Sequence, residues 1–171
     1  WLNFEGSAPQ VTGNMNNSFA GLQASVLFAL KVLIDPDGPT NHGMLDPVHI
    51  DAPEASVVNA SFPAATAARA QTCQRIIDVI LGALAPAVPE RVIAACNGAN
   101  GVATFSGEGP DGQYYLYMET IGGGAGGRSY QDGSDGIQVH VTNTSNLPVE
   151  ALESEYPCLL YTSDAADEEL R

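Results

Sequence analysis

Basic side chains are scarce in this chain. Its 171 residues include 20 acidic residues but only 6 lysines and arginines, which gives a formal net charge of −14 at neutral pH. Binding to nucleic acid or to an anionic membrane depends on clustered lysines and arginines that neutralise phosphate groups. The composition therefore argues against both kinds of partner.

Cysteine is also sparse, and long apolar runs are missing. The three cysteines, at positions 73, 96 and 158, follow neither the spacing of a metal site nor that of a disulfide framework. A reducing, cytoplasmic environment fits this usage best. No apolar run reaches the length of about 18 residues that a transmembrane helix needs, and no signal-peptide pattern is visible. Because the sequence starts at Trp1, this says nothing about a parent protein.

Two stretches have the apolar period of an α-helix, and hydrophobic residues make up 44% of the chain. Residues 16–34 form the first stretch, and Ser18 can cap it. The second helix begins within residues 64–72 and runs to about Ala85, where Pro86 ends it. The apolar positions predicted to line the two helices are Phe19, Leu22, Val26, Leu30 and Leu33, and Cys73, Ile76, Ile77, Ile80 and Leu84.

The other segments indicate strands and turns. Residues 44–65 contain three prolines and predict short edge strands with connectors, and residues 101–120 predict a hairpin that turns at residues 108–112. Residues 136–143 predict a further strand, and residues 146–157 a short capped helix. The predicted fold class is α+β, with two long buried helices packed against mixed or antiparallel strands.

A glycine run follows the second hairpin strand, in the sequence "YYLYMETIGGGAGG" at residues 114–127. Gly122, Gly124 and Gly127 have the G-x-G-x-x-G spacing of a dinucleotide site, which requires a helix directly after the glycines. Residues 128–136 have turn chemistry and no helical period. We therefore expect Gly122, Gly123 and Gly124 to allow close approach of other backbone or of a ligand.

Few residues are candidates for catalysis. Glu119 ends the aromatic strand beside the glycines, where a carboxylate can accept backbone N–H bonds or act as a base. His140 either occupies a half-buried strand position or faces a site together with Asn143. We take Glu119, His140 and Asn143 as the catalytic candidates.

Other reactive residue types have simpler interpretations. Asp132 and Asp135 suit turns better than a cation site, and Cys73 falls on an apolar helix stripe. Cys96 has no base next to it in the sequence, which a nucleophile requires. The three histidines have no metal-site spacing, and the sequence assigns no metal ligand or cofactor-binding residue.

Residues 158–171 do not continue the pattern of the preceding chain. Back-translation of residues 158–168 matches a transposase-type sequencing adapter, and a natural acidic terminus is the alternative. We expect a partial domain over residues 1–157 and a disordered, artefactual tail over residues 158–171.

Four stretches carry a resemblance to a known family: "FEGSAPQVTGNMN", "NHGMLDPVHIDAPEASVVNASFPAA", "TCQRIIDVILGALAPAVPERVIAA" and "YYLYMETIGGGAGGRSYQDGSDGIQVHVTNTSNLPVEALESEYP". In this order they resemble the hydantoinase B/oxoprolinase family, which includes the B-type component of N-methylhydantoinase, the C-terminal part of 5-oxoprolinase and the acetone carboxylase alpha subunit. The resemblance covers roughly residues 3–157 and makes the chain a C-terminal-half fragment. Cys73 stands where the family usually has serine.

The resemblance implies a function in ATP-dependent opening of a cyclic amide such as a hydantoin or 5-oxoproline. A hydantoinase A-type partner would use ATP and Mg²⁺ to activate the ring carbonyl, in a cytoplasmic hetero-oligomer. A divalent metal would be bound by the family's His/Asp motifs, which lie upstream of this region. An acetone carboxylase alpha-type role and a non-catalytic assembly module for the A-type partner are the alternatives.

We predict that Glu119→Gln, in the full-length enzyme assembled with its partner, lowers turnover at least about tenfold, or about 1.4 kcal/mol of barrier. The substitution keeps the size of the side chain and removes its charge, so the fold and the assembly should persist. Steady-state kinetics and a melting curve check this. Wild-type turnover with a lower melting temperature would assign Glu119 to structure alone.

Overall fold

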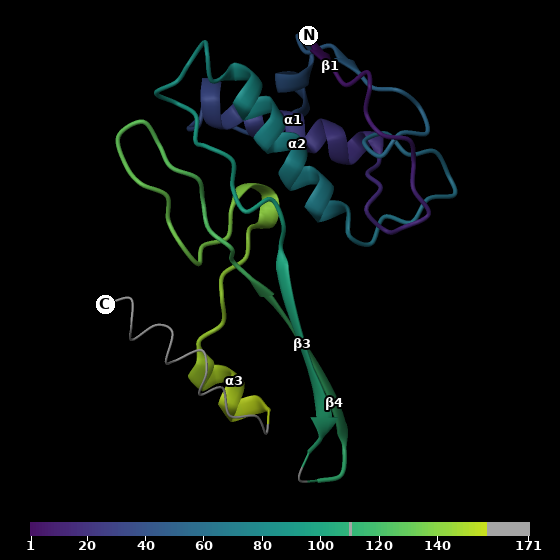
Figure 1. The fold of residues 1–171 in the computed structure, drawn as a ribbon, viewed down its shortest axis with the longest axis vertical. Helices are drawn as coiled ribbons and strands as arrows, with labels where there is room; N and C mark the ends of the chain where they lie inside the picture. The colour runs from purple at the N-terminus through teal and green to yellow at the C-terminus, as the bar shows by residue number, and fades with distance from the viewer. Residues whose placement is uncertain (110, 157–171) are drawn as a thin grey trace.

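The computed structural model describes residues 1–109 and 111–156, which form a helical body and a long two-stranded ribbon (Figure 1). The body contains helices α1 (Phe19–Ile34) and α2 (Arg69–Leu84). The ribbon of β3 (Gly101–Glu108) and β4 (Tyr114–Ile121) extends away from this body, and the short helix α3 (Val149–Glu155) lies beside it (Figure 1). This mixture confirms the predicted α+β class.

Helices α1 and α2 pack together through the apolar faces that the sequence predicts, except that Phe19 at the start of α1 is 38% exposed and lies outside the core. The Ser18 hydroxyl caps α1 by accepting a 3.2 Å hydrogen bond from the Gly21 amide. Apart from Val79, the exposed positions of α2 carry polar or small side chains, so burial of its apolar stripe drives the pairing. The buried core consists of Leu22, Val26, Ala29, Leu33, Val58, Ile76, Ile77, Ile80, Leu81 and Val92.

The segments around the helix pair form very short strands, as the prolines of this region predict. Strand β1 (Leu2–Asn3) pairs in parallel with β2 (Ile50–Asp51), and a 3₁₀ helix, η1 (His42–Leu45), precedes β2. Leu2, Ile50 and several neighbouring apolar residues pack against the helix core and close one end of the body.

The ribbon is an antiparallel hairpin in which Phe105 faces Tyr117 and Thr104 faces Met118. Tyr156, at the end of α3, lies against Tyr115 and Tyr117, with ring centroids 5.7 and 4.9 Å apart. The predicted hairpin and the predicted helix after residue 146 are confirmed. The predicted side-chain cap of that helix is wrong, because Pro148 occupies the N-cap position and has no hydrogen-bonding side chain.

The strand predicted at residues 136–143 is also wrong, since this segment contains a 3₁₀ helix, η2 (His140–Thr142). His140 has φ +51° and Asn143 has φ +47°, and both values lie in the left-handed region outside the range of a β-strand. The valine-rich sequence has strand propensity, but long-range hydrogen bonds of this segment with α2 override it.

No helix among residues 1–109 and 111–156 has the length and apolar character needed to cross a membrane. The predicted boundary at residue 157 and the tail at residues 158–171 lie outside the described residues.

Helix α2 offers a matched test of its packing. Ile77 is fully buried whereas Val79 is 62% exposed, so Ile77→Ala should lower the free energy of unfolding by about 2–5 kcal/mol. Val79→Ala should change it by less than about 0.5 kcal/mol. Urea denaturation of both variants checks this, and equal losses would contradict the observed orientation of α2.

Candidate functional site

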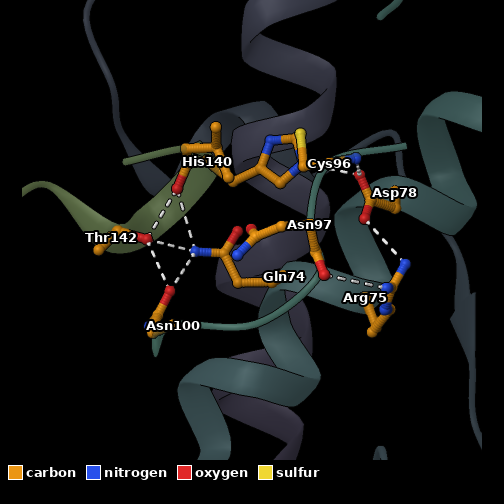
Figure 2. Close-up of polar contacts among 9 residues, drawn as sticks. Gln74, Arg75, Asp78, Cys96, Asn97, Asn100, His140 and Thr142 are labelled. Atoms are coloured by element: carbon orange, nitrogen blue, oxygen red, sulfur yellow. Dashed lines mark hydrogen bonds and ion pairs between the residues drawn. The ribbon is translucent and has the colours of Figure 1, made fainter. Parts of the chain in front are cut away.

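Three reactive side chains from distant parts of the sequence meet beside α2 (Figure 2). Asp78 lies on α2, Cys96 lies in the extended segment that follows this helix, and His140 begins η2. The His140 Nε2 atom is 2.9 Å from Asp78 Oδ1, within hydrogen-bond distance. One potential ligand atom from each of the three residues lies within 4.8 Å of the other two. We call this group the Asp–Cys–His cluster.

The carboxylate of Asp78 is held on both of its oxygens. Oδ1 accepts a hydrogen bond of 3.2 Å from the Cys96 amide, and Oδ2 lies 3.3 Å from Arg75 Nη1. Arg75 also donates from Nη2 to the Asn97 carbonyl at 3.4 Å. The Asp78 side chain is only 5% exposed and that of Arg75 is 54% exposed. The positive charge of the Arg75 guanidinium, which is partly in solvent, thus compensates the negative charge of the buried Asp78 carboxylate.

A buried amide on α2 fixes the position of His140. Gln74 Nε2 donates to the Val139 carbonyl at 3.0 Å and to the Thr142 hydroxyl, and the hydroxyl in turn donates to Val139 at 2.8 Å (Figure 2). The Phe28 ring meets the His140 ring edge-on, with centroids 6.0 Å apart. Only 3% of the His140 side chain is exposed, so its orientation is set from several sides.

The glycine run holds the segment of Cys96 in place through backbone contacts. The Ala94 amide donates to Gly127 at 2.8 Å, and on the other side the Gly124 amide donates to Ile137 at 3.1 Å. A Cβ atom on Gly126 would lie 2.1 Å from the Ala94 carbonyl oxygen, and one on Gly122 would lie 2.5 Å from the carbonyl carbon of Ile137. The run therefore packs between two chain segments at a distance that side chains would prevent.

A pocket of about 520 Å³ is lined in part by His140. Its size falls in the range of small-molecule sites, and its composition combines apolar walls with a few polar groups. Its lining residues are Phe28, Val32, Leu81, Arg91, Ile93, Ala125, Arg128, Tyr130, Ile137, Gln138, Val139 and His140.

The environment of Cys96 disfavours its thiolate. Burial raises the pKa of the Cys96 thiol, the charge of Asp78 and its hydrogen bond add to this, and the Gly126 amide and Arg75 oppose it. Because the folded state disfavours the thiolate, the free energy of unfolding declines as the pH rises through the ordinary range of thiol ionisation. These contacts therefore favour the thiol form of Cys96 over the nucleophilic thiolate.

The structure separates the residues that the sequence analysis selected. His140 belongs to the cluster and also lines the pocket. Glu119 accepts a 3.3 Å hydrogen bond from the Leu147 amide and is absent from both sets, and Asn143 is exposed and absent from the pocket lining. Gly122 and Gly124 approach backbone, while Gly123 packs against the Asn97 side chain.

Asp78 and Cys96 were missed because sequence spacing does not connect them to His140. Cys96 has no basic neighbour in the sequence, yet the fold places an imidazole and a carboxylate close to its sulfur. One signal was available: Gln74 and Asp78 are four residues apart, so these two polar side chains share one face of the predicted helix.

The sequence profile of the hydantoinase B/oxoprolinase family matches residues 1–168. The chain belongs to this family. It is 42% identical to an uncharacterized protein of Methanocaldococcus jannaschii over 93% of the chain. It is 37% identical over 94% to 5-oxoprolinase 1 of Arabidopsis thaliana, and 34% identical over 91% to a Pseudomonas protein named as the B-type component of a D-/L-hydantoinase. The sequence resemblance to hydantoinase B proteins is thereby confirmed.

One solved structure also resembles this hydantoinase B/oxoprolinase fold. The ATP-dependent caprolactamase of Pseudomonas jessenii superposes with a TM-score of 0.69 at 26% identity, over 89% of this chain and 28% of that one. The chain likewise spans 28%, 12% and 27% of the lengths of the three relatives above. It thus corresponds to one part of these longer proteins.

The pKa of Cys96 gives a test of the cluster. In a Cys73→Ser/Cys158→Ser background, Asp78→Asn should lower the pH midpoint of Cys96 alkylation by iodoacetamide, because a nearby negative charge is removed. Arg75→Met should raise the midpoint, because a nearby positive charge is removed.

Unfolding would itself return the thiol to its ordinary pKa and lower the midpoint, so circular dichroism must show that each variant is folded. The rise expected in Arg75→Met has the opposite direction to the effect of unfolding. Asp132→Asn, an exposed residue outside the cluster, serves as the matched control and should leave the midpoint unchanged. An unchanged midpoint in Asp78→Asn would show that Asp78 does not act on the thiol.

Proposed function

We propose that this chain is part of the B-type component of an ATP-dependent amidohydrolase that opens a small cyclic amide. The likeness to an ATP-dependent caprolactamase carries the proposal, because the name of that enzyme includes both a cyclic amide substrate and ATP. The relatives named 5-oxoprolinase and hydantoinase point to the same class of ring. Hydantoin and 5-oxoproline are the substrates we propose.

Ring opening needs activation because resonance protects the amide carbonyl from water. We assign this activation to a hydantoinase A-type partner that uses ATP and Mg²⁺, since the chain has a single lysine, Lys31, and no P-loop motif. The two proteins would form a cytoplasmic hetero-oligomer, and the upstream half of the B-type component would hold any divalent metal of the family. The free thiols of Cys73 and Cys96 suit a reducing compartment.

The pocket beside His140 is the substrate site we propose within this part of the B-type component. Phe28, Ile93 and Ile137 supply apolar walls for ring carbons. Arg91 donates from Nη1 to the Leu33 carbonyl at 2.9 Å and so has a structural role at the pocket edge. Arg128 also lines the pocket. A guanidinium there can pair with the carboxylate of 5-oxoproline, which hydantoin lacks.

The ribbon supports a second candidate function, that of an assembly module. Tyr114, Leu116 and Met118 project from one face of β4 and are 72%, 60% and 63% exposed. A two-stranded hairpin is marginally stable alone and gains stability from a covering surface. A protein that only holds an A-type partner would need this face and no substrate pocket. An acetone carboxylase alpha-type activity is a further alternative within the same family.

The full-length B-type protein, assembled with its A-type partner, should open 5-oxoproline and hydantoin rings only with ATP. Arg128→Met should raise the KM for 5-oxoproline about tenfold, the effect of losing one charge-assisted hydrogen bond. The KM for hydantoin should stay unchanged. Product formation and ADP release measured together check this.

Arg69→Met, at the start of α2 and outside the pocket lining, is the matched control and should affect neither substrate. ATP-dependent consumption of acetone and bicarbonate would favour the carboxylase alternative. An assembled complex that turns over none of these compounds would favour the assembly module. The isolated 171-residue chain should be inactive, because most of the B-type component and the partner are missing.

A further inference from the structure

Asp78 and Cys96 have no part in the proposed substrate pocket, yet they form a buried polar cluster with His140. The exposed fractions of the Asp78 and His140 side chains are 5% and 3%, and Cys96 is 6% exposed. Burying a carboxylate, an imidazole and a thiol together costs free energy, because each group loses hydration in the protein interior. A common binding function would account for this cost. The fold brings them together from three separate segments.

We propose that Asp78, Cys96 and His140 bind one divalent cation of the Zn²⁺ type. Sulfur, nitrogen and carboxylate oxygen are the donors that Zn²⁺ accepts, and the thiol selects against Mg²⁺ and Ca²⁺. Donor atoms around a tetrahedral zinc ion lie about 3.3–3.8 Å apart. The cluster spans this range, with 2.9 Å between His140 Nε2 and Asp78 Oδ1 and an upper limit of 4.8 Å for the three donor atoms.

The charges of the cluster suit a divalent ion. A bound cation neutralises one carboxylate and one thiolate, whereas without it the buried thiolate is opposed by the neighbouring carboxylate. Binding releases the proton of the Cys96 thiol to solvent and replaces the His140–Asp78 hydrogen bond by two bonds to the ion. His140 binds through Nε2 as the Nδ1–H tautomer, so the proton of the Nε2–Asp78 hydrogen bond is transferred to Nδ1 by exchange with solvent, and the thiol proton is the one released.

The residues behind the three ligands are arranged to orient them. Arg75 contacts the second oxygen of Asp78, and the hydrogen bonds of Gln74 with Val139 fix the residue before His140. Such outer contacts position metal ligands in known sites. Three protein ligands leave a tetrahedral ion one further position, and His140 also borders the pocket of about 520 Å³. This site uses none of the upstream family motifs and does not rest on the proposed ring-opening reaction.

Cobalt(II) is the probe that tests the site, since it replaces zinc and reports its ligands by absorption. The test uses the metal-stripped 171-residue chain with Cys158→Ser, titrated first with Co²⁺ and then with Zn²⁺. We expect one equivalent to bind, with a thiolate-to-cobalt charge-transfer band and tetrahedral ligand-field bands that Zn²⁺ abolishes. The apparent affinity should rise about tenfold per pH unit below the thiol pKa, because one proton is released.

Cys96→Ser should abolish the charge-transfer band and the steep pH dependence, and Asp78→Asn should weaken binding at least about tenfold. Cys73→Ser and His49→Gln replace a cysteine and a histidine outside the cluster, and both should leave the spectrum unchanged. Circular dichroism verifies that each variant is folded.

Zinc should also protect Cys96 from alkylation in the otherwise unmodified Cys73→Ser/Cys158→Ser chain, which requires no change at the site itself. Absence of a stoichiometric cobalt spectrum together with unaltered alkylation in excess Zn²⁺ would overturn the proposal. A charge-transfer band that survives in Cys96→Ser would also overturn it, because another thiol would then be the ligand.

Discussion

The buried amide of Gln74 is the constraint on which the site depends. Its side chain is fully enclosed, and its Nε2 group must find acceptors within the protein. The Val139 carbonyl and the Thr142 hydroxyl provide these acceptors. Both hydrogen bonds suit the 3₁₀ turn of η2, which follows Val139, and not an extended strand. His140 follows Val139 directly and Asp78 lies one helical turn beyond Gln74, so one hydrogen-bonded contact sets both sides of the cluster.

The glycine run positions Cys96, the third member of the cluster, through backbone contacts. No side chain of the run reaches the cluster; instead, its backbone bonds on one edge to the segment of Cys96 and on the other to residues 134–137. The hydrogen bonds of α2 and the close backbone packing of the glycines together position the segments that carry Cys96 and His140. For a member of the hydantoinase B/oxoprolinase family, this gives the glycine run a role in shaping a site through its backbone alone.

The parts of the fold that depend on local chemistry could be predicted from the sequence. The Ser18 cap, the apolar stripe around Ile77 and the hairpin of β3 and β4 all follow from residues that are neighbours in the chain. The site could not be predicted in this way. Asp78, Cys96 and His140 are brought together by tertiary contacts, and the positive φ of His140 contradicts the strand propensity of the valines beside it.

Sequence separation has a consequence for how this protein folds. The β3–β4 hairpin closes a short loop, whereas Cys73 of α2 meets Gly21 of α1 across 52 residues, Gln74 meets Val139 across 65 and His140 meets Asp78 across 62. Local contacts lose less chain entropy when they form, so the hairpin can order before the helix pair and η2 dock. The cluster depends on the long-range contacts and therefore acquires its native geometry after the hairpin. An ion held there would link η2 directly to α2 and so connect two segments that are 62 residues apart in the sequence.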